Sequence, residues 1–425
     1  MKALLSIAAR SAWNRRGTLA LVVFSIALAT ALLLSLERLR TDIRSSFTSA
    51  VSGTDLVVGA RTGPVQLMLY AVFRVGGATH NIRMDSVRAI AAQRAVAWVV
   101  PIALGDSHRG HPVLGTTPEY FTRFLYGDRQ PLALVQGRAF AGTLDGLYEA
   151  VLGAEVAEAL GYRLGQKLTL SHGLGGLDGA SEHGDKPFTV VGILARTGTP
   201  VDRTLHIGLQ AIEALHLDWS GGAPVPGLKV APEFARKFDL EPKTVTAALV
   251  GLKSRSAVFR VQRFVADYAE EPLLAVLPGV ALDELWAAVG LGEQALLAIS
   301  GLVALVSLAS LVAVVLAGLN ERRRELAVLR AVGAGPRAVL LLLAMEGALV
   351  TVAGALFGAA AAAVAVLAAG PWMQQRFGIT LAADAPTAAQ WGLFGAVLAA
   401  GILASLMPGW RAYRLSLADG LSPRT

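Results

Sequence analysis

The residues of this chain that could do chemistry gather between positions 80 and 216, where all seven histidines fall. A glycine-rich loop over 171–187 carries imidazole and carboxylate donors close together, namely His172, Glu182, His183 and Asp185. These are ligand types that divalent transition metals prefer. The gap between His172 and His183 matches no compact zinc motif, so a metal site and an ordinary solvated loop both stay open.

Catalytic chemistry has little support in the sequence. Ser107 and His108 are adjacent, but no nucleophile-elbow pattern surrounds them. No stretch matches G-x-x-x-x-G-K-[ST], so the sequence contains no phosphate-binding loop of that type. The chain has no cysteine, which excludes disulfides, cysteine-ligated zinc and thiol catalysis. We therefore expect no enzyme activity and no cofactor in this chain itself.

The composition of the chain indicates which helices and domains must position these residues. Apolar residues make up 54% of the 425 residues and charged residues 16%, a balance typical of membrane proteins. A helix of about 20 apolar residues spans the hydrocarbon core. Four windows qualify: 17–36, 294–319, 338–370 and 388–410. The sequence therefore predicts a polytopic α-helical membrane protein with four transmembrane helices.

Between the first and second spans, residues 37–293 have the mixed composition of a folded domain outside the membrane. Runs rich in Val, Ile, Leu and Thr predict strands at 55–60, 97–105, 167–172, 187–195 and 244–253. Apolar spacing of three and four predicts helices at 118–127, 153–162, 209–218 and 255–271. We expect a large extracytoplasmic α+β domain, in which 136–207 could be an inserted lobe.

The short segments indicate orientation, because Lys and Arg accumulate on the cytoplasmic side. Three short segments are rich in basic residues: 1–16, the loop 320–337 and the tail 411–425. The first of these also suits a short interfacial helix. The loop 371–387, by contrast, has only Arg376. Both termini are expected in the cytoplasm, and 37–293 and 371–387 outside. The net charge of +7 then reflects topology and requires no nucleic acid. Small residues at 29–31 resemble a signal-peptide cleavage site, but the apolar core continues beyond them and favours an uncleaved anchor.

The loop 320–337 predicts a short amphipathic helix on the cytoplasmic side. Leu326 and Leu329 form an apolar stripe among its arginines, and Gly333, Gly335 and Pro336 end it. Positive charge alone would serve to fix topology. The apolar stripe needs a surface to cover it, which favours docking to a cytoplasmic partner.

A family resemblance rests on these residues. The stretch "NERRRELAVLRAVGAGPRAVLLLLAMEGALVTVAGALFGAAAA" (320–362) resembles the signature segment of FtsX-like permeases, the membrane subunits of MacB and LolC/LolE type ABC systems. The ending "MPGWRAYRLSLADGLSPR" (407–424) is similar to that family's Pro-x-x-Arg-Ala ending. The layout of one span, a large outer domain and three further spans is also similar.

The resemblance implies a permease subunit of mechanotransmission type in the bacterial inner membrane. A separate cytoplasmic ATPase, carrying ATP and Mg, would contact the helix between the second and third spans and move the outer domain. A second permease protomer, a periplasmic or lipoprotein partner and membrane lipids would complete its surroundings. The coupling residues would be Glu321, Arg322, Arg323, Arg324, Glu325, Leu326, Leu329 and Arg330. The alternatives are a membrane-tethered receptor or scaffold that binds a ligand or metal, and a regulator of cell-wall enzymes.

The third span contains further candidates. Glu346 is its only ionisable residue, and an intramembrane carboxylate normally faces protein or water. It could position the helix through an interhelical hydrogen bond, or the same bond could transmit motion. Gly347 and the G-x-x-x-G pair Gly354 and Gly358 allow close helix approach, either within the chain or to a second protomer.

Overall fold

The computed structural model describes residues 16–78, 80–173, 183–220, 223–225, 227–321, 328, 331, 333–377, 381 and 384–414. The chain divides into two compact units. The helical unit comprises Met1–Asp42, Val289–Met373 and Leu381–Thr425. The sheet unit comprises Ile43–Ala288 and Gln374–Thr380.

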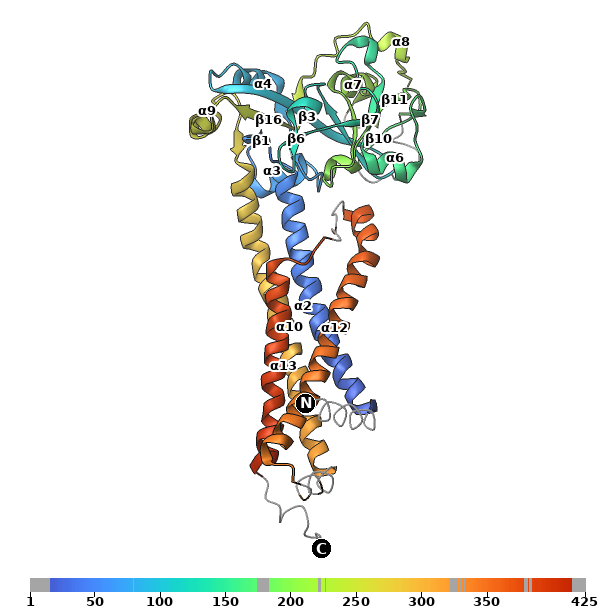
Figure 1. Cartoon of the computed structure of the whole chain (residues 1–425). Coiled ribbons are helices and arrows are strands. Elements are labelled where there is room, and N and C mark those ends of the chain that lie inside the picture. The colour runs from blue at the N-terminus through green and yellow to red at the C-terminus, as the bar shows by residue number, and fades with distance from the viewer. Residues whose placement is uncertain are drawn as a thin grey trace. The chain divides into compact units, whose positions relative to one another are not determined.

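Four long helices dominate the helical unit (Figure 1): α2 (Arg16–Ser49), α10 (Pro278–Glu321), α12 (Pro336–Phe377) and α13 (Ala388–Arg414). Each is long and apolar enough to cross a membrane. They extend beyond the windows expected from hydropathy, because helical backbone continues into the polar residues that flank each apolar core. The predicted class, a four-helix membrane protein with a large domain between the first and second spans, is confirmed.

The four helices share one apolar core. Its buried members come from all of them: Leu19, Val22, Ile26, Leu33, Leu311, Val315, Val350, Ala355 and Val397. Other large apolar side chains on the same helices are exposed, such as Leu21 and Phe24 on α2. Helices that are apolar on all sides in this way suit a lipid environment.

Glycines bring the helices of this core close together. A Cβ on Gly354 would lie 2.8 Å from Cβ of Ile26, and one on Gly358 would lie 2.5 Å from the carbonyl oxygen of Ala27. A Cβ on Gly347 would lie 2.4 Å from Cβ of Ser405 on α13. These distances leave no room for a side chain, so the three glycines pack α12 against α2 and α13 of the same chain.

Polar side chains add a few links between helices. The hydroxyl oxygens of Ser25 on α2 and Ser307 on α10 are 2.8 Å apart. Gln390 Nε2 donates to the carbonyl oxygen of Leu34 at 3.2 Å. Arg38 Nη1 donates to the carbonyl oxygen of Asp384 at 3.3 Å, which ties the segment before α13 to α2.

One mixed sheet organises the sheet unit. Among the described residues eleven strands join it, with nine in the order β17-β1-β16-β3-β4-β12-β8-β11-β7, while β10 pairs with β3 and β9 with β11. The pairs β4–β12 and β8–β11 are parallel, and the others are antiparallel. The strands are β1 (Leu56–Ala60), β3 (Val96–His108), β4 (His111–Thr116), β7 (Leu134–Gly137), β8 (Glu149–Leu152), β9 (Lys167–Leu168), β10 (Ser171–His172), β11 (Phe188–Leu194), β12 (Leu205–Gly208), β16 (Ala247–Leu252) and β17 (Leu273–Val276).

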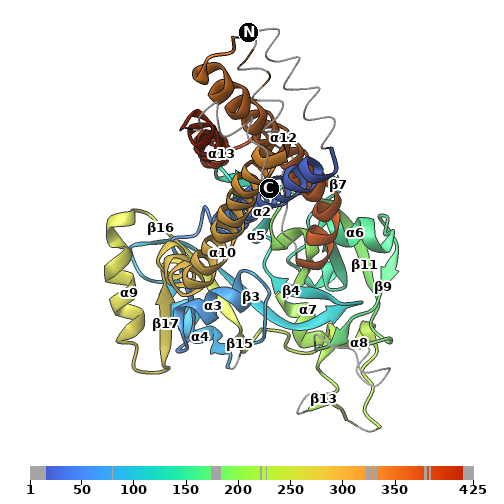
Figure 2. The same cartoon turned by 90° about the horizontal axis from the view of Figure 1, so that it is seen from below.

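Helices cover both faces of this sheet, and strand alternation decides which side chain meets which helix. On β1, Val57 points to a core that includes Leu67 of α3 (Pro64–Ala71). Its neighbour Val58 points to the opposite core, which includes Ile90 of α4 (Met84–Ala91) and Val261 of α9 (Val258–Ala266). Figure 2 shows α9 beside β17 at one end of the sheet.

A third core fills the other end of the sheet. Strands β8, β11 and β12 contribute to it together with α6 (Ala154–Leu160) and α7 (Leu209–Leu215). The strands of the stretch 136–207 thus belong to the same sheet as the rest of the unit, and they pack on this third core on one face while Val151 and Leu194 join the core that contains Leu67. The shorter elements are β2 (Ile82–Arg83), α5 (Tyr120–Arg123), β5 (Leu125–Tyr126), β6 (Gln130–Pro131), η1 (Leu144–Gly146), η2 (Pro200–Arg203), β13 (Trp219–Ser220), β14 (Ala223–Pro224), α8 (Pro232–Ala235), β15 (Thr244–Val245) and η3 (Arg255–Ala257).

Most expected elements of this unit are present, with two differences. The strands expected at 55–60, 97–105, 187–195 and 244–253 correspond to β1, β3, β11 and β15–β16. The helix expected over 118–127 is wrong beyond one turn, because Phe124 adopts an extended backbone and the chain enters β5. The strand expected over 167–172 is split into β9 and β10, which pair with different partners.

Candidate functional site

A carboxylate and an imidazole face each other across two paired strands of the sheet unit. The register of β10 on β3 sets His172 opposite Asp106. Residues directly opposite in an antiparallel pair project from the same face. Nδ1 of His172 accordingly lies 3.1 Å from Oδ1 of Asp106, and this hydrogen bond raises the pKa of His172.

A second histidine reaches the pair from the end of α7. Nδ1 of His216 lies 2.8 Å from the carbonyl oxygen of Ile212. A carbonyl oxygen only accepts, so Nδ1 carries the hydrogen and Nε2 of a neutral ring has its lone pair free. That Nε2 lies 3.2 Å from Nδ1 of His172 and 3.6 Å from Oδ1 of Asp106.

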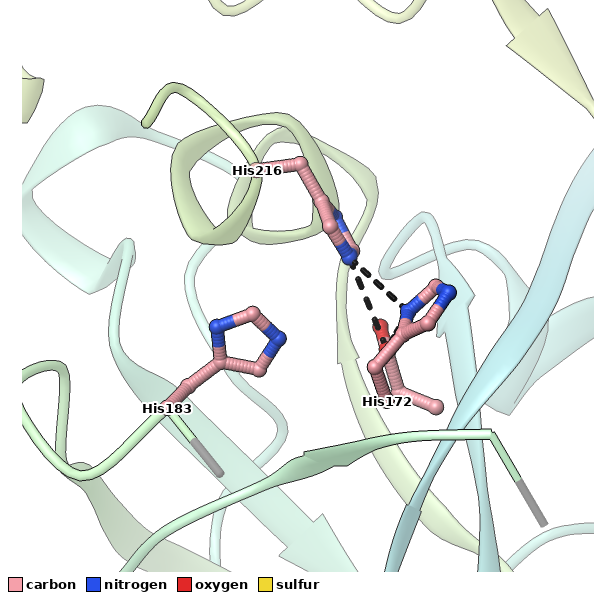
Figure 3. A group of neighbouring side chains, drawn as sticks. His172, His183 and His216 are labelled. Carbon is pink, nitrogen blue, oxygen red and sulfur yellow. Dashed lines mark hydrogen bonds and ion pairs between the residues drawn. The ribbon is translucent and has the colours of Figure 1, made fainter. Parts of the chain in front are cut away.

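His183 completes the group. Its ring is buried, and neither ring nitrogen has a hydrogen-bond partner among the described residues. Burial lowers the pKa of His183 to about 4, so the ring is neutral at physiological pH. The ring centroids of His183 and His216 are 5.2 Å apart, and Figure 3 shows the three histidine rings converging from separate segments of the chain.

These four side chains form one compact cluster of donor atoms, which we call the histidine cluster: Asp106, His172, His183 and His216. One ligand atom from each lies within 4.8 Å of one from every other. Asp106 and His183 are buried, whereas the side chains of His172 and His216 are 37% and 26% exposed. Two of the four side chains of the cluster are therefore buried in the sheet unit, and the other two are accessible to solvent.

Two neighbouring contacts support the histidine cluster. The ring of Trp219 packs on His183 with centroids 4.4 Å apart and also contacts His172 and His216. Lys186, three residues after His183, is fully buried, and its Nζ lies 2.5 Å from Oδ1 of Asp218. Burial is the largest single effect and would raise the pKa of Asp218, but the hydrogen bonds from Lys186 and from the backbone N–H of Val230, together with the charge of Lys186, outweigh it and lower that pKa.

The sequence placed only half of this group together. His172 and His183, which the sequence suggests as ligands of one site, both belong to the histidine cluster. Asp185 was expected with them but lies outside the cluster, with its carboxylate 4.0 Å from Lys186 Nζ, and Glu182 lies outside the described residues. Asp106 and His216 were missed, because only the β3–β10 register and the end of α7 bring them in.

The remaining histidines are placed elsewhere. His108 is buried, and its ring contacts the carbonyl oxygen of Thr169 and the hydroxyl of Tyr162. His206 is buried beside Tyr120 and Phe121, whereas His80 is exposed.

In the helical unit, Glu346 on α12 is buried at 2% exposure. Of the expected coupling residues, Glu321 is the last residue of α10. The others lie outside the described residues: Arg322, Arg323, Arg324, Glu325, Leu326, Leu329 and Arg330.

Two family models match the chain. The model described as FtsX-like permease C-terminal matches residues 297–417, and the model described as MacB-like periplasmic core domain matches residues 17–223. Together they cover most of the helical unit and much of the sheet unit. No curated protein sequence matches the chain.

Two solved structures are similar in part. The periplasmic region of MacB from Actinobacillus actinomycetemcomitans has a TM-score of 0.34 at 12% identity, covering 56% of this chain and 97% of its own. The extracellular domain of the noncanonic ABC-type transporter YknZ from Gram-positive bacteria has a TM-score of 0.29 at 13% identity, covering 46% of this chain and 89% of its own.

Proposed function

Because the chain belongs to the FtsX-like, MacB-type family of ABC transporter permeases, we propose that it couples ATP binding and hydrolysis by a separate ATPase to movement of its sheet unit. The observation that carries this proposal is the layout of the chain. Four apolar helices are present, and the large sheet unit is inserted between the first and second of them.

The packing of the helical unit favours mechanical transmission over a conducting pathway. The core shared by α2, α10, α12 and α13 is mainly apolar, with a few buried polar side chains such as Thr30, Ser307 and Glu346. Gly354 and Gly358 bring α12 into close contact with α2, and Gly347 brings it into close contact with α13. A movement passed along such helices requires no opening through them.

The segment between α10 and α12 is the proposed contact with the ATPase. It carries Leu326 and Leu329 at helical spacing, together with five arginines within 320–337. We expect the two leucines to be buried against the ATPase, and Arg322, Arg323 and Arg324 to pair with acidic residues on its surface.

Orientation and partners follow from charge and layout. Arginine-rich ends and the arginine-rich 320–337 segment favour a cytoplasmic position for both termini and that segment, in a bacterial inner membrane. The sheet unit would then act outside the membrane on a periplasmic or membrane-extracted cargo, with a second permease protomer alongside. Lipoprotein partners and lipids are the expected surroundings.

Purification in mild detergent tests the proposal most directly. The chain is isolated from its native host, co-purifying proteins are identified by mass spectrometry, and ATP hydrolysis is assayed on the eluate. We expect an ATPase with a phosphate-binding loop at near-equal stoichiometry. Leu326→Asp should remove both the ATPase and the activity, because a charge would replace a buried apolar contact.

A matched control distinguishes loss of this apolar contact from the effect of adding a negative charge to the segment. Val328→Asp adds the same charge in the same segment, at a side chain that is 61% exposed. It should retain the ATPase. A single chain that purifies without any ATPase would instead support a membrane-tethered receptor or scaffold.

A further inference from the structure

We propose that Asp106, His172, His183 and His216 bind one divalent transition-metal cation, with Zn²⁺ as the ion that suits these donors best. The inference rests on the histidine cluster in the sheet unit and not on coupling to an ATPase. Its test is therefore independent of the test of the proposed function.

The spacing of the donor atoms is close to what a tetrahedral ion requires. With metal–ligand bonds of about 2.0–2.1 Å, neighbouring ligand atoms of a tetrahedral zinc site lie about 3.3 Å apart. Nδ1 of His172 is 3.1 Å from Oδ1 of Asp106 and 3.2 Å from Nε2 of His216, and the last two atoms are 3.6 Å apart. These three distances match three edges of such a tetrahedron, and a His183 nitrogen lies within 4.8 Å of one ligand atom from each of the other three residues.

The chemistry of the donor set selects the class of ion. Three imidazoles and one carboxylate suit Zn²⁺ and neighbouring transition metals, whereas Mg²⁺ and Ca²⁺ prefer sites made of oxygen. The four ligands are enough to close a tetrahedral structural site. We therefore expect tight binding of Zn²⁺ and little competition from Mg²⁺.

Residues around the cluster fix the tautomer and the position of the proposed ligands as metal binding requires. The hydrogen bond from His216 Nδ1 to the carbonyl oxygen of Ile212 leaves Nε2 as the coordinating atom, the outer-sphere arrangement typical of metal-bound histidine. The Lys186–Asp218 pair and the ring of Trp219 fix the segment that carries His183. The partly exposed rings of His172 and His216 provide a path for the ion from solvent.

The competing explanation is a hydrogen-bonded group that binds no metal. It accounts for Asp106, His172 and His216, whose polar atoms contact one another. It leaves both ring nitrogens of the buried His183 without a partner in the described part of the chain. Buried polar atoms are rarely left unpaired. A metal ion would occupy one of these nitrogens, and this difference favours the metal site.

Metal binding to the full chain tests the proposal. The protein is purified in detergent without a histidine tag, stripped with a chelator and titrated with Zn²⁺ by calorimetry, and bound zinc is counted by elemental analysis. We expect one Zn²⁺ per chain. His183→Ala should weaken binding by at least about 10- to 100-fold, since loss of even an outer-sphere partner has that effect.

His80→Ala is the matched control, because His80 is an exposed histidine of the same unit outside the cluster. It should bind Zn²⁺ like the unsubstituted chain. Thermal unfolding in chelator shows whether His183→Ala is folded; if it is not, Asp106→Asn and His216→Gln replace it, with the same expected loss. Stripped protein loaded with Co²⁺ should give visible absorption bands that the cluster variants lack.

Three results would overturn the proposal. The first is no Zn²⁺ bound at one equivalent by the unsubstituted chain. The second is equal binding by folded cluster variants and His80→Ala, which would place the ion elsewhere. The third is displacement of the ion by Mg²⁺ at similar concentration, which would indicate an oxygen site.

Discussion

Lys186 and Asp218 form a buried ion pair in the sheet unit, with Nζ of the lysine 2.5 Å from Oδ1 of the aspartate and both side chains under 10% exposed. Nζ also donates to the carbonyl oxygen of Leu215, at the end of α7. The pair thus joins the turn that carries His183 to the helix that precedes His216. Neither charge has much access to water, so each depends on the other.

Removal of the lysine should therefore destabilise the sheet unit. Lys186→Met leaves the Asp218 carboxylate buried without its partner, a change that typically costs about 3–5 kcal/mol. Unfolding by denaturant, followed by tryptophan fluorescence, measures the loss. Lys229→Met, at an exposed lysine, should cost little. The double variant Lys186→Met with Asp218→Asn should be more stable than Lys186→Met alone; an equally unstable double variant would show that the charge is not the cause.

Acid should destabilise the sheet unit through His206. Burial and the nearby Arg74 lower the pKa of His206 to about 3 in the folded chain, while the unfolded chain titrates near 6.5. The unfolded state then binds the extra proton below pH 6.5, so stability falls as pH decreases from 6.5 toward 3. Between pH 6.5 and 5.5 this group should contribute a loss of about 1 kcal/mol.

His206→Leu tests that contribution, because the leucine side chain is similar in size to histidine and has no group that can bind a proton. The unfolding free energy is measured at several pH values, and the slope is compared with that of the unsubstituted chain. We expect a shallower decline in the variant and an unchanged decline in His80→Leu. Parallel slopes for all three proteins would contradict the assignment.

Close packing of α12 on α2 predicts sensitivity at Gly358. Its Cβ would lie 2.5 Å from the carbonyl oxygen of Ala27 and 2.6 Å from Cβ of Thr30, and backbone cannot move aside cheaply. Gly358→Ala should thus cost about 1–3 kcal/mol in spite of alanine's higher helix propensity. Thermal stability in detergent provides the measurement. Gly392→Ala on α13, where no atom lies within 4 Å of the new Cβ, should be neutral or stabilising.

Substitutions of Glu346 distinguish a role in hydrogen bonding from a role that depends on its charge. The side chain is buried on α12, where a carboxyl group must be matched by polar surroundings. Glu346→Gln keeps hydrogen-bonding capacity, so we expect normal assembly with the ATPase and normal melting temperature. Glu346→Leu should lower the melting temperature, since it leaves the surrounding polar groups unmatched. A collapse of ATPase activity in a well-assembled Glu346→Gln complex would show that the charge itself is needed.

The sequence predicted the membrane helices and part of the sheet, because these depend on local composition, but it did not predict β4, β7, β8, β12 and β17. Long apolar runs identify α2, α10, α12 and α13, and the run at 187–195 identifies β11. The early end of α5 could not be predicted, because the apolar spacing over 118–127 is helical throughout whereas the backbone at Phe124 is extended.

The histidine cluster was only half predictable for a related reason. His172 and His183 are close enough in sequence to suggest a shared site. Asp106 joins them through the register of β10 on β3, and His216 through the position of α7, which are both long-range features. A single sequence offers no local signal for either one.

The position of β1 in the sheet has a consequence for biosynthesis. This strand comes first in the unit, yet both of its neighbours, β16 and β17, come last: Val57 pairs with Leu249 and Val276. During translation β1 must therefore wait, with both edges unpaired, until nearly the whole unit has been made. Unpaired strand edges are prone to aggregation, and pairing between distant segments is slow. The nascent chain should consequently depend on chaperones in the compartment where the sheet unit folds until β16 and β17 arrive.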